Sequence, residues 1–212
     1  MRRCAAQVMV LGLLLSMSGC LMLRPESQPI HMYQLSLGSE SQKQEMGRTN
    51  STGAILLVGL PQASPGFDTQ QMVYLTRPYE VNYFSANQWI DTPARMLTPL
   101  LITTLEKTGM WRAVDTAPSS LRADYRVDVT GLVLAQEFWQ SPSQVRLAWR
   151  AQLIDLPNGQ VLGTHQFEAR QEAQSEDAYG GVRAANQILG GLLNEMVLWL
   201  ETCVNEPRKA PC

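Results

Sequence analysis

Apolar and polar residues alternate most regularly in the second half of the chain, over 124–134 and again over 145–153. A period of two is typical of strands that bury one face and expose the other. The turn sequence Pro157-Asn158-Gly159 favours a hairpin into a third strand over 160–172. Gly131 interrupts the first alternation, which indicates a bulge. The pattern therefore predicts an antiparallel meander with one polar and one apolar face.

The first half of the chain has shorter apolar runs of a different kind. Residues 54–60 are continuously apolar between a glycine and a proline, which is the pattern of a strand buried on both faces. Residues 72–75 and 80–84 flank an Arg-Pro interruption and predict a hairpin. Two weaker runs predict short strands, over 31–37 and 111–114.

Two helices are predicted where apolar residues recur three or four positions apart. The first begins at Asp91-Thr92-Pro93 and ends at Gly109 as a left-handed cap. Pro99 inside it predicts either a bend or a helix that becomes regular only after this residue, because an interior proline costs about 3 kcal/mol. The second begins at Ser175, with a core stripe of Val182, Ala185, Leu189, Leu193, Met196 and Leu200. Its glycines predict close approach of this helix to the sheet, at Gly180, Gly181, Gly190 and Gly191.

Together these elements predict an α+β fold, with a mixed, mainly antiparallel sheet and two main helices packed on one of its faces. The chain has 212 residues, a length that suits one domain. We place this domain at residues 30–204, followed by a tail over 205–212. A hydrophobic content of 45% is sufficient for its core.

The N-terminus has the pattern of a secretory signal. Arg2 and Arg3 precede an apolar run to Met17, and Ser18-Gly19-Cys20 follows. This triplet looks like a bacterial lipobox, in which the cysteine thiol takes a diacylglyceryl group and the peptide is cut before it. We predict a lipoprotein signal peptide over 1–19, lipidation at Cys20 and a tether over 20–29. Met17 stands where leucine is usual. The alternative is an uncleaved anchor whose apolar run continues through Leu23.

Charge and cysteine usage narrow the class of partner and the compartment. The formal net charge is −2, and it becomes −4 without Arg2 and Arg3. An acidic mature chain argues against nucleic acid as a partner. Cys203 and Cys212 are left over once the signal and the lipidated cysteine are set aside, and in an oxidising periplasm they could pair. The alternative is a frayed proline-containing tail in which such a bond would do little.

No catalytic constellation is evident in the sequence. His31 and His165 are the only histidines, each in a predicted strand and without a ligand partner at metal-binding spacing. The sequence contains no phosphate-binding loop, nucleophile elbow or HExxH motif. We therefore expect no cofactor and no metal, and a protein that is not an enzyme.

Aromatic residues are concentrated beside one arginine in the segment 74–97. Aromatics and arginine are enriched at protein interfaces. We predict a partner interface, or a contact with a second protomer, at Tyr74, Arg77, Tyr79, Tyr83 and Trp89. The alternative is that these aromatics simply pack beneath the first helix.

The sequence resembles the ABC-type transport auxiliary lipoproteins. The resemblance rests on the segments MVYLTRPYEVNYFSANQWIDTPARML, ADYRVDV and AANQILGGLLNEMVLWL, together with the lipobox. It implies a periplasmic lipoprotein on the inner side of the outer membrane. It also implies partnership with an MCE-domain protein and an ABC permease and ATPase in lipid transport, by docking and not by catalysis. Leu21 after the lipidated cysteine agrees with outer-membrane sorting.

Two other functions stay open at this point. One is a lipoprotein of outer-membrane biogenesis that binds lipopolysaccharide or a barrel protein. The other is a periplasmic enzyme tethered by lipid, against which the absence of convergent acid, base and nucleophile groups counts. A homo-oligomer is compatible with each of these functions.

Overall fold

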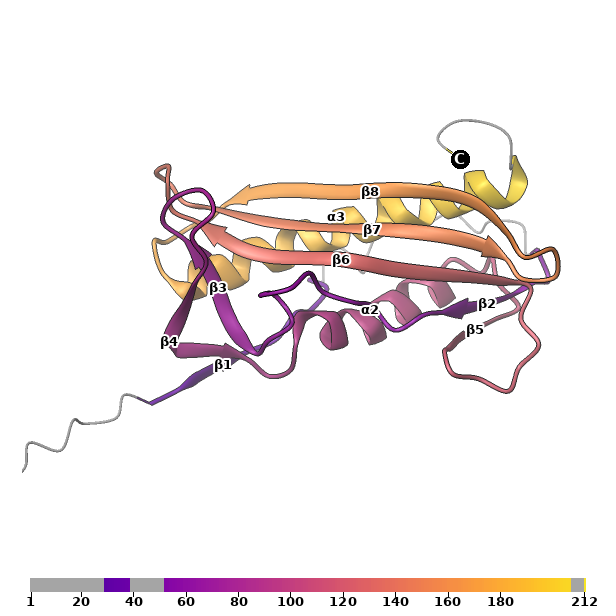
Figure 1. Ribbon diagram of the computed structural model, residues 1–212, viewed down its shortest axis with the longest axis horizontal. Helices are drawn as coiled ribbons and strands as arrows, with labels where there is room; N and C mark the ends of the chain where they lie inside the picture. The colour runs from indigo at the N-terminus through magenta and orange to yellow at the C-terminus, as the bar shows by residue number, and fades with distance from the viewer. Residues whose placement is uncertain (1–28, 39–51, 207–211) are drawn as a thin grey trace, which may run out of the picture.

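The computed structural model describes residues 29–38, 52–206 and 212. The predicted signal peptide, Cys20 and nearly all of the tether lie outside these residues. The described part is one eight-stranded mixed sheet with two helices (Figure 1). Its elements are β1 (His31–Tyr33), β2 (Ile55–Val58), β3 (Gln71–Leu75), β4 (Asn82–Trp89), α2 (Pro93–Lys107), β5 (Ala113–Thr116), β6 (Tyr125–Glu137), β7 (Gln144–Asp155), β8 (Gln160–Glu172) and α3 (Ala178–Asn205).

The meander predicted from the alternation is confirmed as β6, β7 and β8, which pair in antiparallel order. Trp149 stands opposite Phe167 on the apolar face, and Arg146 stands opposite Arg170 on the polar face. The predicted bulge is also present, because the register of β6 shifts between Thr130 and Val133. Hydrophobic burial on one face and solvation on the other explains the period of two.

Strand β6 joins the two halves of the molecule. Its second edge pairs in parallel with β2 near Tyr125 and with β3 near Gln136. Between these contacts, the backbone of the segment after β2 continues along β6, with Ser64 N donating to Leu132 O at 2.9 Å. The parallel pairings of β2 and β3 with β6, and of β2 with β5, link segments far apart in the sequence.

The N-terminal strands agree with prediction in type and differ in extent. Leu56 and Val58 are fully buried on one face of β2, and on the other face Ile55 is 9% exposed and Leu57 is partly buried, as predicted for a strand covered on both faces. The predicted hairpin is β3 and β4, and β4 continues to Trp89. The first strand is shorter than predicted and ends at Tyr33. Strand β5 begins two residues later than predicted, at Ala113.

Helix α2 has the predicted ends. Thr92 is its N-cap and accepts a hydrogen bond from Arg95 N at 3.4 Å. Gly109 follows the helix with φ +66°, the left-handed conformation that terminates helices. Pro99 lies inside an uninterrupted helix with an exposed ring. The helix is therefore already regular before Pro99.

Helix α3 covers β6, β7 and β8 on the same face as α2, and the two helices contact each other. Its N-cap is Asp177, whose carboxylate accepts from Gly180 N at 2.7 Å, and not Ser175. All six residues of the predicted stripe are buried. Gly181 confirms the expected close approach, because a Cβ there would lie 2.4 Å from Gln136 Oε1. Gly191 makes no such close approach, because it is exposed and no atom lies within 4 Å of where a Cβ would be.

The core lies between the helices and the meander. Trp149 and Phe167 are its largest fully buried side chains, with ring centroids 5.9 Å apart. Phe167 also meets Trp199 of α3 edge to face at 5.8 Å. His165 lies beside them, 4.6 Å from the ring of Phe167. This histidine is therefore part of the aromatic packing between β8 and α3.

Cys203 and Cys212 form a disulfide, with their Cα atoms 5.2 Å apart. Cys203 is fully buried. The bond lies directly over Gly163 of β8, where a Cβ would be 2.6 Å from Cys212 Sγ. The predicted pairing is therefore present, and it places Cys212 against β8.

No helix in the described part of the chain is long and apolar enough to cross a membrane.

Candidate functional site

The turn between β3 and β4, residues 76–81, is called the hairpin tip below. Pro78 has no backbone N–H, so it suits a turn and not a central strand. Glu80 N donates to Arg77 O at 3.3 Å and closes the turn. The side chains of Arg77 and Glu80 form an ion pair, and Asn82 Nδ2 donates to Glu80 Oε1 at 3.3 Å. The hydrogen bond from Arg77 lowers the pKa of Glu80, so this carboxylate is ionised and holds the arginine in place.

Tyr79 is the most unusual residue of the hairpin tip. Its side chain is fully exposed, and its backbone has φ +70°, the only positive φ among the described non-glycine residues. A bulky residue in the left-handed region costs of order 1 kcal/mol or more and persists only where the surroundings hold it. The turn thus holds a large aromatic ring in solvent at a conformational cost. This combination is the strongest single indication of a contact surface.

A cluster of three aromatic rings supports the hairpin tip. Tyr74 and Phe84 have centroids 4.7 Å apart, and Phe138 meets them at 6.0 Å and 6.5 Å. Phe138 belongs to the β6–β7 turn, and its N–H donates to Leu75 O at 2.7 Å. The hairpin tip and this turn therefore lie side by side at one end of the sheet (Figure 1). Trp139, next along the turn, is 42% exposed.

The structure divides the predicted interface residues into two groups. Arg77, Tyr79 and Tyr83 are exposed, and Tyr74 is half-buried in the ring cluster. Trp89 is 3% exposed, so its assignment to the interface is wrong. The sequence predicted a strand ending at residue 84, whereas β4 runs on to residue 89 and carries this tryptophan into the core. Trp139 was missed, because its exposure depends on a turn that sequence alone does not orient.

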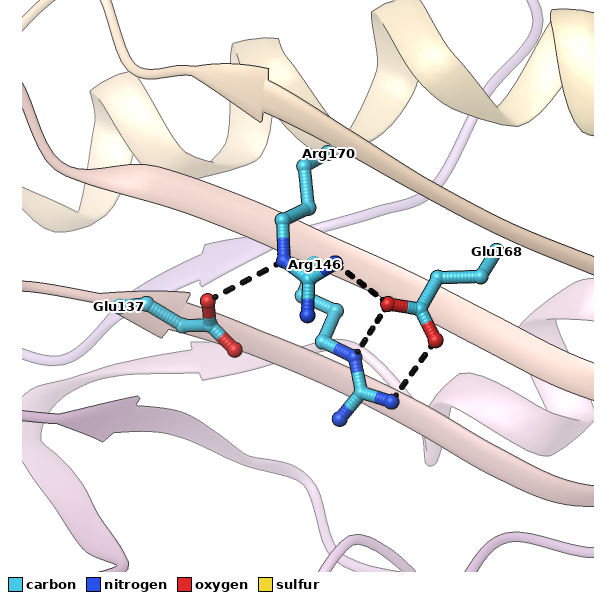
Figure 2. Close-up of polar contacts among 4 residues, drawn as sticks. All are labelled: Glu137, Arg146, Glu168 and Arg170. Atoms are coloured by element: carbon cyan, nitrogen blue, oxygen red, sulfur yellow. Dashed lines mark hydrogen bonds and ion pairs between the residues drawn. The ribbon is translucent and has the colours of Figure 1, made fainter. Parts of the chain in front are cut away.

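The polar face of the meander is not covered by a helix and carries an ion-pair network. Arg146 donates to both carboxylate oxygens of Glu168, at 3.1 Å and 2.9 Å (Figure 2). Arg170 lies between Glu168 and Glu137, with its Nε 3.5 Å from Glu137 Oε2. Glu137 is 4% exposed. Two arginines and two glutamates therefore neutralise one another across the three strands.

A groove of about 410 Å³ lies further along the same face. Arg126 and Asp128 line it and form a bidentate pair at 2.8 Å and 2.7 Å. Arg150 and Gln152 of β7 line it too, and Leu60 and Pro118 form part of its wall. The groove is open, and its lining is partly polar and partly apolar. The described residues place no acid, base and nucleophile together in it.

The ion-pair network should make stability depend on pH through Glu168. Its pKa is lowered, first by the hydrogen bond from Arg146 and further by the charge of Arg170. Its stabilising contribution is present above the unfolded pKa of about 4.3 and is lost as pH falls through the lower folded pKa. Glu168→Gln should lower the free energy of unfolding at pH 7 by about 1 kcal/mol or less, and should flatten its decline in acid.

Urea unfolding at pH 7 and at pH 3 measures this difference. Glu172→Gln is the matched control, because Glu172 is on the same strand and forms no ion pair with a described residue. If Glu168→Gln and Glu172→Gln give the same pH dependence, the network does not contribute to stability.

The described residues do not assemble a metal site or a catalytic triad. No group of three or more His, Cys, Asp or Glu side chains within residues 29–38, 52–206 and 212 could hold a metal ion. His165 Nε2 lies 3.6 Å from Glu195 Oε1, and its ring stacks on Trp199. This pair joins β8 to α3.

Comparison with known proteins identifies the class. A sequence model of the ABC-type transport auxiliary lipoprotein component matches residues 33–197. The chain belongs to this family, which comprises auxiliary components of transport and is not a class of enzymes. The match spans every element from the end of β1 into α3. A comparison with curated proteins gives no significant match.

The solved structures that share this fold include two that cover more than four fifths of this chain. Protein XCC0632 from Xanthomonas campestris, assigned to DUF330, is 18% identical, with a TM-score of 0.71 over 84% of this chain and 97% of that one. A second crystal structure, of an uncharacterized protein, is 16% identical, with a TM-score of 0.62 over 82% of this chain and 99% of that one. This chain aligns with nearly the full length of both structures, so the shared fold extends over almost all of each of them.

Proposed function

We propose that this protein is an accessory lipoprotein of an ABC-type lipid transport system that contains an MCE-domain protein. In this proposal Cys20 carries the lipid, and the domain lies on the periplasmic side of the outer membrane. The protein acts by docking the transporter and not by catalysis. Membership of the auxiliary lipoprotein family over residues 33–197 is the observation that carries the proposal.

The position of the proposed lipid limits how far the domain can move from the membrane. The segment from Cys20 to Pro29 has ten residues and spans at most about 35 Å when fully extended. One acyl chain gives only marginal binding to a membrane, and more than one gives stable anchoring. A lipidated Cys20 would therefore hold the domain at the membrane surface, within reach of a transporter that bridges the envelope.

The hairpin tip is the surface that we assign to the partner. It offers Arg77 and Tyr79 in exposed positions, next to the exposed Tyr83 of β4 and Trp139 of the neighbouring turn. Tyrosine, tryptophan and arginine are the residues that most often dominate binding energy at interfaces. The ring cluster below the tip keeps it rigid, which lowers the entropy lost on binding.

Truncation of the hairpin tip should separate docking from folding. Tyr79→Ala, alone and combined with Arg77→Ala, should weaken co-purification with the MCE-domain protein by about thirtyfold, equivalent to about 2 kcal/mol. Stability should change by no more than about 0.5 kcal/mol, because both side chains are exposed. The measurement is quantitative affinity purification from membranes of the native host.

The matched control is Tyr179→Ala, which removes a 55% exposed tyrosine at the start of α3. This variant should co-purify like the wild type. Full retention of the transporter by the doubly substituted hairpin tip would show that docking occurs elsewhere. Recovery of an outer-membrane barrel or lipopolysaccharide assembly in place of transport components would favour the biogenesis function.

A further inference from the structure

Strand β8 is a long edge of the sheet. Among the described strands it pairs only with β7, and it extends over thirteen residues at the border of the meander (Figure 1). The other edge strands are short, with three residues in β1 and four in β5. Natural proteins usually keep edge strands short or cover them, because an open edge is a template for pairing with another strand.

The backbone groups that β8 leaves free can be assigned from the register. Ala173 N donates to Ser143 O at 2.8 Å, next to the pair Gln144–Glu172. Because hydrogen-bonded positions alternate along an antiparallel strand, the odd-numbered residues from 163 to 173 direct their backbone groups to β7. The even-numbered residues direct theirs to the free edge, namely Thr164, Gln166, Glu168, Arg170 and Glu172. No described residue hydrogen-bonds to these backbone groups.

Little in the part of the chain that the structure describes protects this edge. The segment from Thr164 to Glu172 contains no proline and no lysine, and the charges that it carries, at Glu168, Arg170 and Glu172, are of both signs. The C-terminal disulfide covers only the start of the strand, where Cys212 Sγ lies 3.5 Å from Leu162 O. Helix α3 contacts β8 through side chains on its inner face, with Trp199 against His165 and Phe167. The helix therefore leaves the backbone edge open.

We propose that β8 of a second copy of this chain pairs with this edge in antiparallel orientation, about a two-fold axis at Ala169. In this register Glu168 stands opposite Arg170 of the second copy, and Arg170 opposite Glu168. Gln166 stands opposite Glu172. The even-numbered residues of both strands then face one another and exchange about eight backbone hydrogen bonds.

Charge complementarity favours a second copy over an unrelated strand. Opposite charges directly across an antiparallel pair are stabilising, and like charges are destabilising. The two-fold axis at Ala169 makes both central pairs opposite in sign. It also joins the Glu137–Arg170–Glu168–Arg146 network of one copy to that of the other. A two-fold interface uses the same patch on both subunits, as this arrangement does.

Amide hydrogen exchange of the full-length protein in detergent tests the pairing directly. At high protein concentration the amides of Gln166, Glu168 and Arg170 should exchange about tenfold more slowly than at low concentration. The odd-numbered amides are already bonded to β7 and should change little. This alternation distinguishes strand pairing from two proteins that only share a micelle. Unchanged exchange of the even-numbered amides in associated protein would overturn the proposal.

A backbone substitution provides a second test. Gln166→Pro removes an N–H that points to the free edge and no hydrogen bond of the β7–β8 ladder, a position where proline is tolerated. It should weaken self-association about tenfold in analytical ultracentrifugation, whereas Gln166→Ala should associate like the wild type. Equal association of both variants, or a wild type that is monomeric at all concentrations, would overturn the proposal. If Gln166→Pro does not fold, the exchange experiment on the wild type decides.

Discussion

Replacement of Cys20 with serine is expected to leave the protein as an unprocessed precursor without lipid. In a lipobox the sulfur atom of the cysteine receives the diacylglyceryl group. Cleavage of the signal peptide follows this lipidation. Without acyl chains the mature form should be absent. The measurement is the intact mass of the protein and its distribution between membrane and soluble fractions.

The matched control for this experiment is Cys4→Ser, which changes a cysteine inside the predicted signal peptide. That variant should be lipidated and cut like the wild type. Maturation of Cys20→Ser to the wild-type size, with retention in the outer membrane, would contradict the lipoprotein assignment. Membrane retention of an uncut Cys20→Ser chain alone would not, because a precursor keeps its apolar segment.

Truncation of Phe167 is expected to have the largest effect on stability. Its ring is fully buried among Trp149, His165 and Trp199. Removal of a buried aromatic ring costs about 3–5 kcal/mol, through lost burial and the cavity that remains. Phe167→Ala should therefore lower the urea midpoint strongly with an unchanged m-value.

Val161→Ala is the control on the same strand, because Val161 is 54% exposed. Its free energy of unfolding should change by no more than about 0.5 kcal/mol. A loss of less than about 1 kcal/mol for Phe167→Ala would mean that the interface between β8 and α3 does not hold the domain together.

The elements that sequence predicted well are those whose signal is local. The alternation of apolar residues fixes which face of β6, β7 and β8 is buried, and the Asn-Gly turn joins β7 to β8. The stripe of α3 was identified completely because it depends only on helical spacing. For the same reason Thr92 was recognised as the start of α2.

Features that depend on contacts distant in sequence were not predicted. Leu56 pairs with Tyr125, and Tyr74 with Gln136, and no short motif encodes such parallel pairings. The burial of Glu137 arises at the junction of β3 and β6. The burial of Trp89 has the same kind of cause, because it lies where β1 pairs with the end of β4. In the candidate site, local signals identified the exposed turn at Arg77 and Tyr79, but not its neighbour Trp139.

The position of β6 between the two halves also has a consequence for the order of folding. Its pairing with β7 requires only a short turn, whereas its pairing with β2 closes a loop of roughly 70 residues, at a greater entropic cost. Local pairings form sooner than distant ones. We therefore expect β6, β7 and β8 to fold first with α3 and to provide the template on which β2, β5 and β3 add later. Pulse-labelled hydrogen exchange during refolding should protect the amides of β7 before those of β2, and the reverse order would contradict this pathway. In a chain that enters the periplasm N-terminus first, the early segments would then remain unpaired until β6 follows them.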